Sequence, residues 1–77
     1  MTRPIYIIAA DIRRHWSPVN YAAKPYLEGM RALDRISDTY GADSGRSVVA
    51  YFLNNASGWR GDEARRIKAE LRAMLAA

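Results

Sequence analysis

The sequence predicts an all-α fold, a compact bundle of about four short helices that forms a single domain over residues 1–77. Apolar residues recur at three- and four-residue spacings in four segments, which is the period of a helix that buries one face. Proline, glycine and small polar residues separate these segments. The hydrophobic share of 49% suits a folded core, although 77 residues lie near the lower end of what buries one unaided.

A first helix is expected at about residues 3–15. Thr2 is a candidate N-cap, and Pro4 falls in the first turn, where its missing N–H costs no hydrogen bond. Ser17-Pro18 ends the helix, because the residue before a proline disfavours helical backbone angles. The apolar face consists of Ile5, Ile8, Ala9, Ile12 and Trp16.

A second helix is expected to begin near residues 22–24, so that Pro25 lies in its first turn. It ends at Gly41, a residue suited to a left-handed stop, or already at residues 37–39. Its buried stripe is formed by Tyr26, Leu27, Met30 and Leu33.

The third helix begins after Asp43 or Ser44, either of which suits the N-cap, and ends at residues 57–58. Residues 48–53 resemble a strand in composition. However, the apolar residues at positions 48, 49, 52, 53 and 56 have helical spacing, and no second strand is evident for pairing.

The fourth helix extends from about residue 61 to residue 76, with Asp62 and Glu63 at its positive end. Its apolar arc contains Ala64, Ile67, Leu71, Met74 and Leu75. The four helices together predict a core of Ile8, Ile12, Leu27, Met30, Leu33, Val49, Phe52, Leu53, Ile67, Leu71 and Met74.

Few side chains offer catalytic or metal-binding chemistry. The chain has no cysteine, and its one histidine, His15, forms an i, i+4 pair with Asp11; zinc needs three or four ligands, so an ion pair at the helix end is favoured. Asp38, Asp43 and Ser44 flank a glycine in a polar loop, but their spacing fits neither an EF-hand nor a P-loop. The sequence also lacks a nucleophile-elbow motif. We therefore expect no enzyme activity, no metal, no cofactor and no small-molecule substrate.

The apolar stretch near the N-terminus is broken at Asp11 and is too short to span a membrane. Because the chain has no cysteine, it cannot form the disulfide bonds that commonly stabilise small secreted domains. A cytoplasmic protein without a membrane partner is expected.

The net charge of +4 permits nucleic acid or an acidic protein as partner. Cations without acidic residues at i±4 are typical of a surface that contacts phosphates, although a solvated face looks the same. Arg66 is expected to pair with Asp62 and Glu70. The stripe beside the apolar arc of the fourth helix contains Arg65, Lys68 and Arg72.

The second helix, the Gly41 turn and the third helix resemble a helix-turn-helix in their order. Arg46 is then the only cation on the reading helix. Val48 and Val49 are out of phase with the apolar positions of that motif, which argues against it. A helix-turn-helix-like DNA- or RNA-binding regulator is therefore the alternative function.

Some apolar residues have no evident role in the core. Ile7 lies on the far side of the first helix, and Ile36 lies off the stripe of the second. Together with Tyr6 and Tyr51 they predict an exposed patch for a protein partner or for a second copy in a homodimer.

Three segments resemble a group of small proteins encoded by actinobacterial phages and prophages. These are residues 19–27 (VNYAAKPYL), 51–56 (YFLNNA) and 59–61 (WRG). The resemblance implies an accessory protein that works in the host cell cytoplasm by binding other macromolecules. We therefore expect a non-enzymatic binding protein, with a host or phage protein as its partner ahead of nucleic acid.

Overall fold

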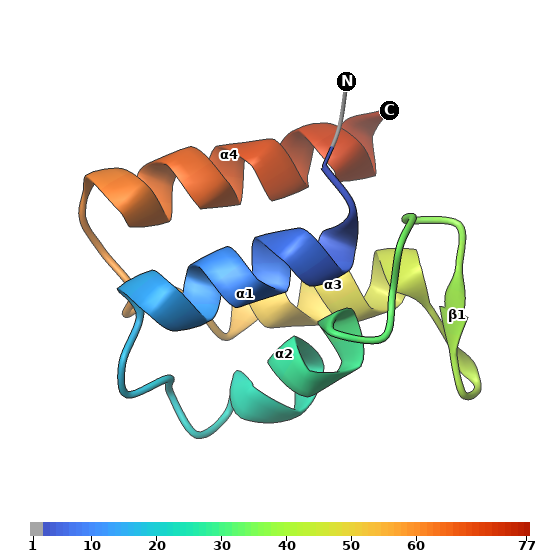
Figure 1. Cartoon of the computed structure of the whole chain (residues 1–77), viewed down its shortest axis with the longest axis horizontal. Helices are drawn as coiled ribbons and strands as arrows, with labels where there is room; N and C mark the ends of the chain where they lie inside the picture. The colour runs from blue at the N-terminus through green and yellow to red at the C-terminus, as the bar shows by residue number, and fades with distance from the viewer. Residues whose placement is uncertain (1–2) are drawn as a thin grey trace.

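A computed structural model describes residues 3–77, so the proposed Thr2 cap lies outside the described residues. The chain is mostly helical, as predicted, but it is not purely all-α, because a two-stranded hairpin interrupts the helices. The elements in chain order are α1 (Ile5–His15), α2 (Lys24–Met30), β1 (Thr39–Tyr40), β2 (Asp43–Ser44), α3 (Gly45–Asn54) and α4 (Asp62–Ala76) (Figure 1).

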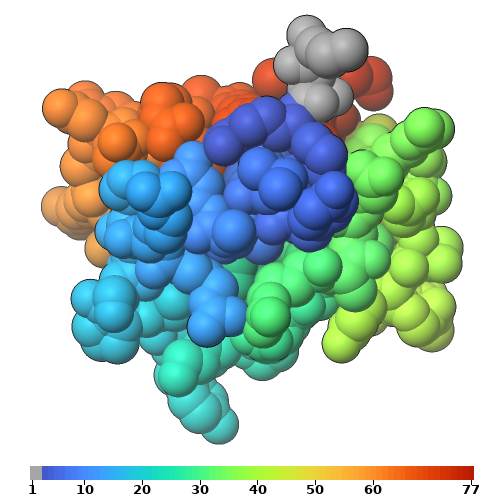
Figure 2. Space-filling model, in the orientation of Figure 1, coloured from blue at the N-terminus to red at the C-terminus, as the bar shows by residue number. Residues whose placement is uncertain are grey.

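The helices enclose one core. α1 and α3 lie across from one another, and each packs against both α2 and α4 (Figure 1). The space-filling view shows α1 in blue on one face of the molecule, between α4 above and α2 below (Figure 2). The molecule measures 29 × 27 × 18 Å.

The predicted core is confirmed except at Leu53, which is half-buried against its edge. Three further buried residues lie outside the helices: Ala23, Ala56 and Trp59. Trp59 is buried in the α3–α4 loop, and its ring stacks on that of Trp16 with centroids 5.3 Å apart. The Trp16 ring also meets Phe52 edge-on at 6.1 Å. The aromatic cluster therefore closes the end of the bundle where α1 ends and the α3–α4 loop begins.

α2 is shorter than predicted, because it ends at Met30 rather than near Gly41. The Asp38 carboxylate accepts hydrogen bonds from the backbone N–H groups of Arg35 and Asp34, at 2.9 and 3.0 Å, and these bonds hold the pKa of Asp38 below its usual value. A helix cannot continue through a segment held in this turn. Ile36 therefore lies in a loop and not on a helix.

The loop after α2 also caps α1. The carbonyl groups of Asp34 and Leu33 accept hydrogen bonds from the N–H groups of Ile5 and Tyr6, both at 2.9 Å. The first N–H groups of a helix have no acceptor within the helix. In α1, backbone carbonyl groups of a distant segment supply the acceptors that a cap side chain normally provides. This contact fixes the loop against the start of α1.

The hairpin pairs Thr39 with Ser44 and Tyr40 with Asp43. Gly41 sits in its two-residue turn with a φ of 61°, a left-handed conformation, so the predicted conformation is confirmed although it serves a strand turn rather than a helix end. Ser44, and not Asp43, caps α3, because its side chain accepts the Ser47 N–H at 3.1 Å.

Candidate functional site

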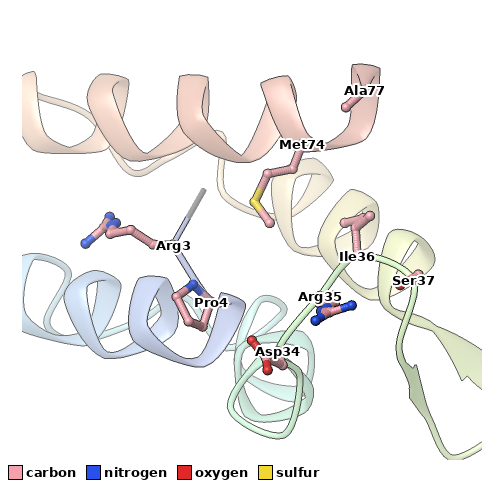
Figure 3. Close-up of a pocket in the computed structure, with 8 residues that line it drawn as sticks. All are labelled: Arg3, Pro4, Asp34, Arg35, Ile36, Ser37, Met74 and Ala77. Atoms are coloured by element: carbon pink, nitrogen blue, oxygen red, sulfur yellow. The ribbon is translucent and has the colours of Figure 1, made fainter. Parts of the chain in front are cut away.

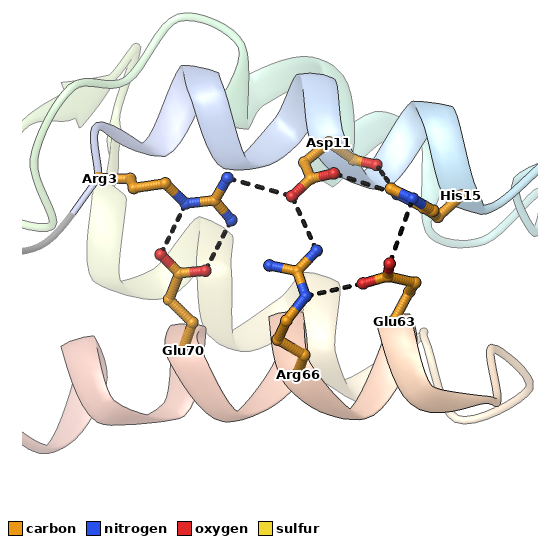
Figure 4. A network of polar contacts seen from close by, with 6 residues as sticks. All are labelled: Arg3, Asp11, His15, Glu63, Arg66 and Glu70. Carbon is orange, nitrogen blue, oxygen red and sulfur yellow. Dashed lines mark hydrogen bonds and ion pairs between the residues drawn. The ribbon is translucent and has the colours of Figure 1, made fainter.

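A polar network joins α1 and α4 along their length (Figure 4). Arg3 donates two hydrogen bonds to Glu70, from Nε to Oε2 at 2.9 Å and from Nη2 to Oε1 at 2.7 Å. Its third nitrogen, Nη1, donates to Oδ2 of Asp11 at 3.1 Å. A two-pronged arginine–carboxylate contact is among the stronger ion pairs, and this one ties residues 67 positions apart.

The same network continues toward the end of α1. Arg66 donates to Asp11 at 3.1 Å and to Glu63 at 2.7 Å, so the predicted pairing of Arg66 with Asp62 and Glu70 is wrong. His15 lies 3.0 Å from Asp11 through Nδ1, as the i, i+4 spacing predicts, and 3.6 Å from Glu63 through Nε2. Asp11, Glu63 and Glu70 are thus all held by cations, an arrangement that joins two helices and leaves none of them as a free base.

The network makes the free energy of unfolding depend on pH. Partial burial acts to raise the pKa of Asp11, but hydrogen bonds from Arg66 and Arg3 outweigh it, so the pKa lies below its usual value. Arg3 likewise lowers the pKa of Glu70. Because both carboxylates bind protons less readily when folded, their contribution is present at neutral pH and is lost as the pH falls below about 4.

Glu70→Gln is expected to lower the free energy of unfolding at pH 7 by about 1 kcal/mol, since a partly exposed pair contributes less than a buried one. The difference in the free energy of unfolding between the variant and the wild type should shrink as the pH falls from 5 to 3, because the wild type then loses the contribution of the Glu70 ion pair. Urea unfolding across that range measures it. Asp62→Asn is the control, because Asp62 is almost fully exposed; a loss as large as that of Glu70→Gln would contradict a special role for the network.

Among residues 3–77, no cluster of three or more histidine, aspartate and glutamate side chains is arranged to hold a metal ion. Over the same part of the chain, none of the helices combines the length and apolar character that crossing a membrane requires.

The four residues predicted for protein binding do not form one patch. Tyr6 and Ile7 are exposed on α1, at 47% and 42%, and Tyr6 borders a shallow hollow between α1 and α2 with Arg13 and Arg31. Tyr51 is 50% exposed on α3, a helix that packs mainly against α2 and α4 rather than against α1. The exposure of these three side chains agrees with the prediction, but their positions on α1 and α3 do not form the single patch that was predicted.

Ile36, the fourth of these residues, is half-buried beside a hollow of about 370 Å³ (Figure 3). This hollow lies between the start of α1, the loop after α2 and the end of α4. Arg3 borders it, but its guanidinium is already bound to Glu70 and Asp11. The lining residues are Arg3, Pro4, Asp34, Arg35, Ile36, Ser37, Met74 and Ala77.

Tyr51 instead belongs to a second aromatic group, on the side formed by α2 and α3. Its ring lies 5.5 Å from that of Tyr26, centroid to centroid. Tyr40, from the hairpin, covers Gly29 so closely that an added Cβ would lie 3.2 Å from its ring. The same Cβ would lie 3.2 Å from Val48. Tyr26 is three residues from Gly29 on α2, and Tyr51 is three residues from Val48 on α3. Residues at this spacing are neighbours on a helix surface, and Gly29 and Val48 lie next to each other. The three rings therefore line one surface.

We call Tyr26, Tyr40 and Tyr51 the tyrosine face. The helical spacing of the sequence predicts Tyr26 in the buried stripe and predicts no role for Tyr40. The i, i+3 spacings on α2 and α3 were visible in the sequence, but the hairpin that brings Tyr40 over Gly29 was not.

The residues predicted for nucleic-acid binding have different surroundings. Arg65 pairs at 2.7 Å with Asp62, an i, i+3 neighbour, which the absence of acidic residues at i±4 did not reveal. Lys68 donates to the backbone carbonyl of Trp59 at 2.6 Å. Within residues 3–77, no carboxylate lies within ion-pair distance of Lys68 or Arg72.

Arg46, on α3, donates to the Leu75 carbonyl near the end of α4. The helix-turn-helix interpretation is wrong in its geometry: residues 31–44, with the hairpin, separate α2 from α3, whereas the motif needs a turn of three or four residues.

Comparison with known proteins gives no match to a protein-family model, a curated protein or a solved structure. The resemblance to phage-encoded proteins therefore stays a prediction, and the surfaces described above carry the functional inference.

Proposed function

We propose that this chain is a non-enzymatic binding protein that engages a protein partner through the tyrosine face. Two observations carry the proposal: the Tyr26 and Tyr51 rings lie 5.5 Å apart, and the Tyr40 ring covers Gly29, which is one turn from Tyr26 on α2. Tyrosine supplies a large, rigid contact area with a polar tip and loses little conformational entropy on binding. Residues of this type dominate the energetics of protein interfaces.

The surroundings of the tyrosine face also suit a protein surface. Uncharged residues lie next to the rings, since Tyr40 covers Gly29 and Val48 lies beside Gly29. Asp43, opposite Tyr40 in the hairpin, stands at the edge. Interface cores are depleted in charge and have polar rims, and half-exposed rings gain about 25 cal/mol per Å² of apolar surface that a partner covers.

The resemblance of three sequence segments to phage-encoded proteins supports a partner in the cytoplasm of the host cell, either a host protein or a phage protein. A second copy of the chain is the other way to cover the face. Light scattering separates the two, because only self-association gives the free protein a dimeric mass.

Tyr51→Ala is expected to reduce capture of the partner from host lysate by about 30-fold or more, the loss typical of a central interface residue. Tyr21→Ala is the matched control, because Tyr21 is 90% exposed and lies outside the tyrosine face. Both variants should keep the helical circular dichroism of the wild type.

The capture is run with and without nuclease, and Ile7→Glu tests whether the exposed part of α1 contributes instead. Capture that survives nuclease and depends on Tyr51 supports the proposal. Capture that needs intact nucleic acid, or that depends on Ile7 and not on Tyr51, contradicts it.

A further inference from the structure

Positive charge gathers without compensation where the α3–α4 loop joins α4. Lys68 is the centre of this group. Arg60 lines the same hollow as Lys68, and Arg72 lies one turn further along α4. Partial burial lowers the pKa of Lys68, and the positive charges of Arg72 and Arg60 lower it further. Arg60 was not among the residues predicted for binding, because it lies outside the fourth-helix stripe. We call Arg60, Lys68 and Arg72 the basic cluster.

The position of Lys68 is fixed while its charge stays available. Its Nζ donates to the Trp59 carbonyl at 2.6 Å and lies 5.9 Å from the centroid of the Trp59 ring. An ammonium group has three N–H donors, and the carbonyl takes one. Trp59 is itself held in the core by its stack on Trp16. The lysine is therefore preorganised, which reduces the entropy lost when an anion binds.

A hollow of about 290 Å³ lies beside the basic cluster. Arg60 and Lys68 border it, together with Arg65 from the first turn of α4 and Ser57 from the loop. Asp62 is the acidic neighbour, and it is bound to Arg65. Beside the apolar Trp59 and Ala64, the lining thus offers cationic and hydroxyl donors, which suit an oxyanion.

The distribution of carboxylates explains why this charge stays unbalanced. The chain has twelve basic and eight acidic residues. Asp11, Glu63 and Glu70 form ion pairs in the network between α1 and α4, which lies on a different side of α4 from the basic cluster. A solvated face that merely keeps a protein soluble interleaves both signs, whereas among residues 3–77 no carboxylate lies within ion-pair distance of Arg60, Lys68 or Arg72.

We propose that the basic cluster binds the phosphate backbone of a nucleic acid. Lys68 and Arg72 are four residues apart on α4, a span of about 6 Å, and a duplex carries a negative charge about every 1.7 Å along its axis, so phosphates are available across the span. The Trp59 ring is buried and stacks on the Trp16 ring, which is partly buried against the core, so the nearby rings contact one another. Binding is therefore independent of base sequence. This proposal does not depend on the tyrosine face.

The experiment is fluorescence anisotropy with a labelled 20-base-pair DNA duplex of mixed sequence, titrated at NaCl concentrations from 25 to 200 mM. With three phosphate contacts, the logarithm of the binding constant should fall with the logarithm of salt at a slope of about −2.7. The variant Arg60→Gln/Arg72→Gln should weaken binding at least about 10-fold at 50 mM NaCl and reduce the slope by about 1.8. Lys68 is left unchanged because it supports Trp59.

The matched control is Arg14→Gln/Arg35→Gln, which removes the same charge at exposed positions on α1 and in the loop after α2. It should change the binding constant less than about 3-fold and leave the slope unaltered, since distant charges are screened. Equal weakening of both double variants, or no binding at 25 mM NaCl, overturns the proposal. A second duplex of different sequence should bind equally; strong preference for one sequence also overturns it.

Two competitors identify the chemistry at constant ionic strength. A deca-glutamate peptide should displace the duplex poorly; displacement as effective as by unlabelled duplex would assign the cluster to acidic protein and overturn the proposal. Inorganic phosphate should compete only at millimolar concentration, as a fragment of a multivalent ligand does. Saturable micromolar binding of inorganic phosphate would assign the hollow to a small phosphate ligand instead.

Discussion

Phe52→Ala is expected to lower the free energy of unfolding by about 3–5 kcal/mol, which would leave much of the protein unfolded at 25 °C. Phe52 is completely buried on α3 and meets the Trp16 ring edge-on. Removing it creates a cavity and takes away one side of the aromatic cluster that closes the bundle. A domain of this size has little stability to spare.

Urea unfolding followed by circular dichroism measures this loss. Tyr51→Ala serves as the comparison, because it removes a ring of similar size from the adjacent position on the same helix, where the side chain is half exposed. Its cost should be clearly smaller. Equal melting temperatures for Phe52→Ala and the wild type would mean that α3 buries a different face.

Gly45→Ala is expected to destabilise the protein by about 1–3 kcal/mol, although replacing glycine by alanine usually favours a helix. A Cβ at this position would lie 2.9 Å from the carbonyl oxygen of Ile36 and 3.0 Å from that of Arg35. Both are backbone atoms that cannot turn aside as a side chain would. The Gly45 N–H also donates to the Asp38 carbonyl at 2.6 Å, so the helix start cannot easily shift.

Gly58→Ala is the matched control, because a Cβ there meets nothing within 4 Å and the backbone does not need a left-handed angle. It should be neutral or stabilising by up to about 1 kcal/mol. The two substitutions are therefore expected to differ in sign, and thermal melting of both variants tests this. Stabilisation by Gly45→Ala would show that the loop after α2 gives way.

The helices were largely predictable because their determinants are local. The spacing of Ile5, Ile8 and Ile12 specifies the buried face of α1, and Pro25 near the start of α2 agrees with its first turn. The same local pattern distinguished α3 from a strand. Of the eleven core residues predicted from these periodicities, ten are buried.

The early end of α2 was not predictable in this way. Residues 31–38 contain no proline and continue an apolar pattern through Leu33 and Ile36. Their turn is stabilised by Asp38, and their carbonyl groups are used by the start of α1, about 28 positions earlier in the chain. Tertiary contacts of this kind override helix propensity without leaving a periodic signal.

The candidate surfaces were predicted only in part for the same reason. A helical wheel places Lys68 and Arg72 on one side of α4, but it does not show Arg60 in the preceding loop. It identifies Tyr51 as exposed, but not that Tyr26 lies against it from another helix. Wheels assign directions within one helix, whereas a surface is assembled from several.

The hydrogen bonds from Ile5 and Tyr6 to the loop after α2 also affect how the molecule opens. The first turn of a helix ordinarily frays, because its N–H groups are bonded only to water. Here those amides are released only when residues 33 and 34 separate from α1, and that separation exposes Leu33, which is fully buried. Arg3 also donates a hydrogen bond to Glu70, and this bond links the same end of α1 to α4. The beginning of α1 therefore behaves as part of the cooperative core, and local fluctuations there require the loss of contacts with two distant segments.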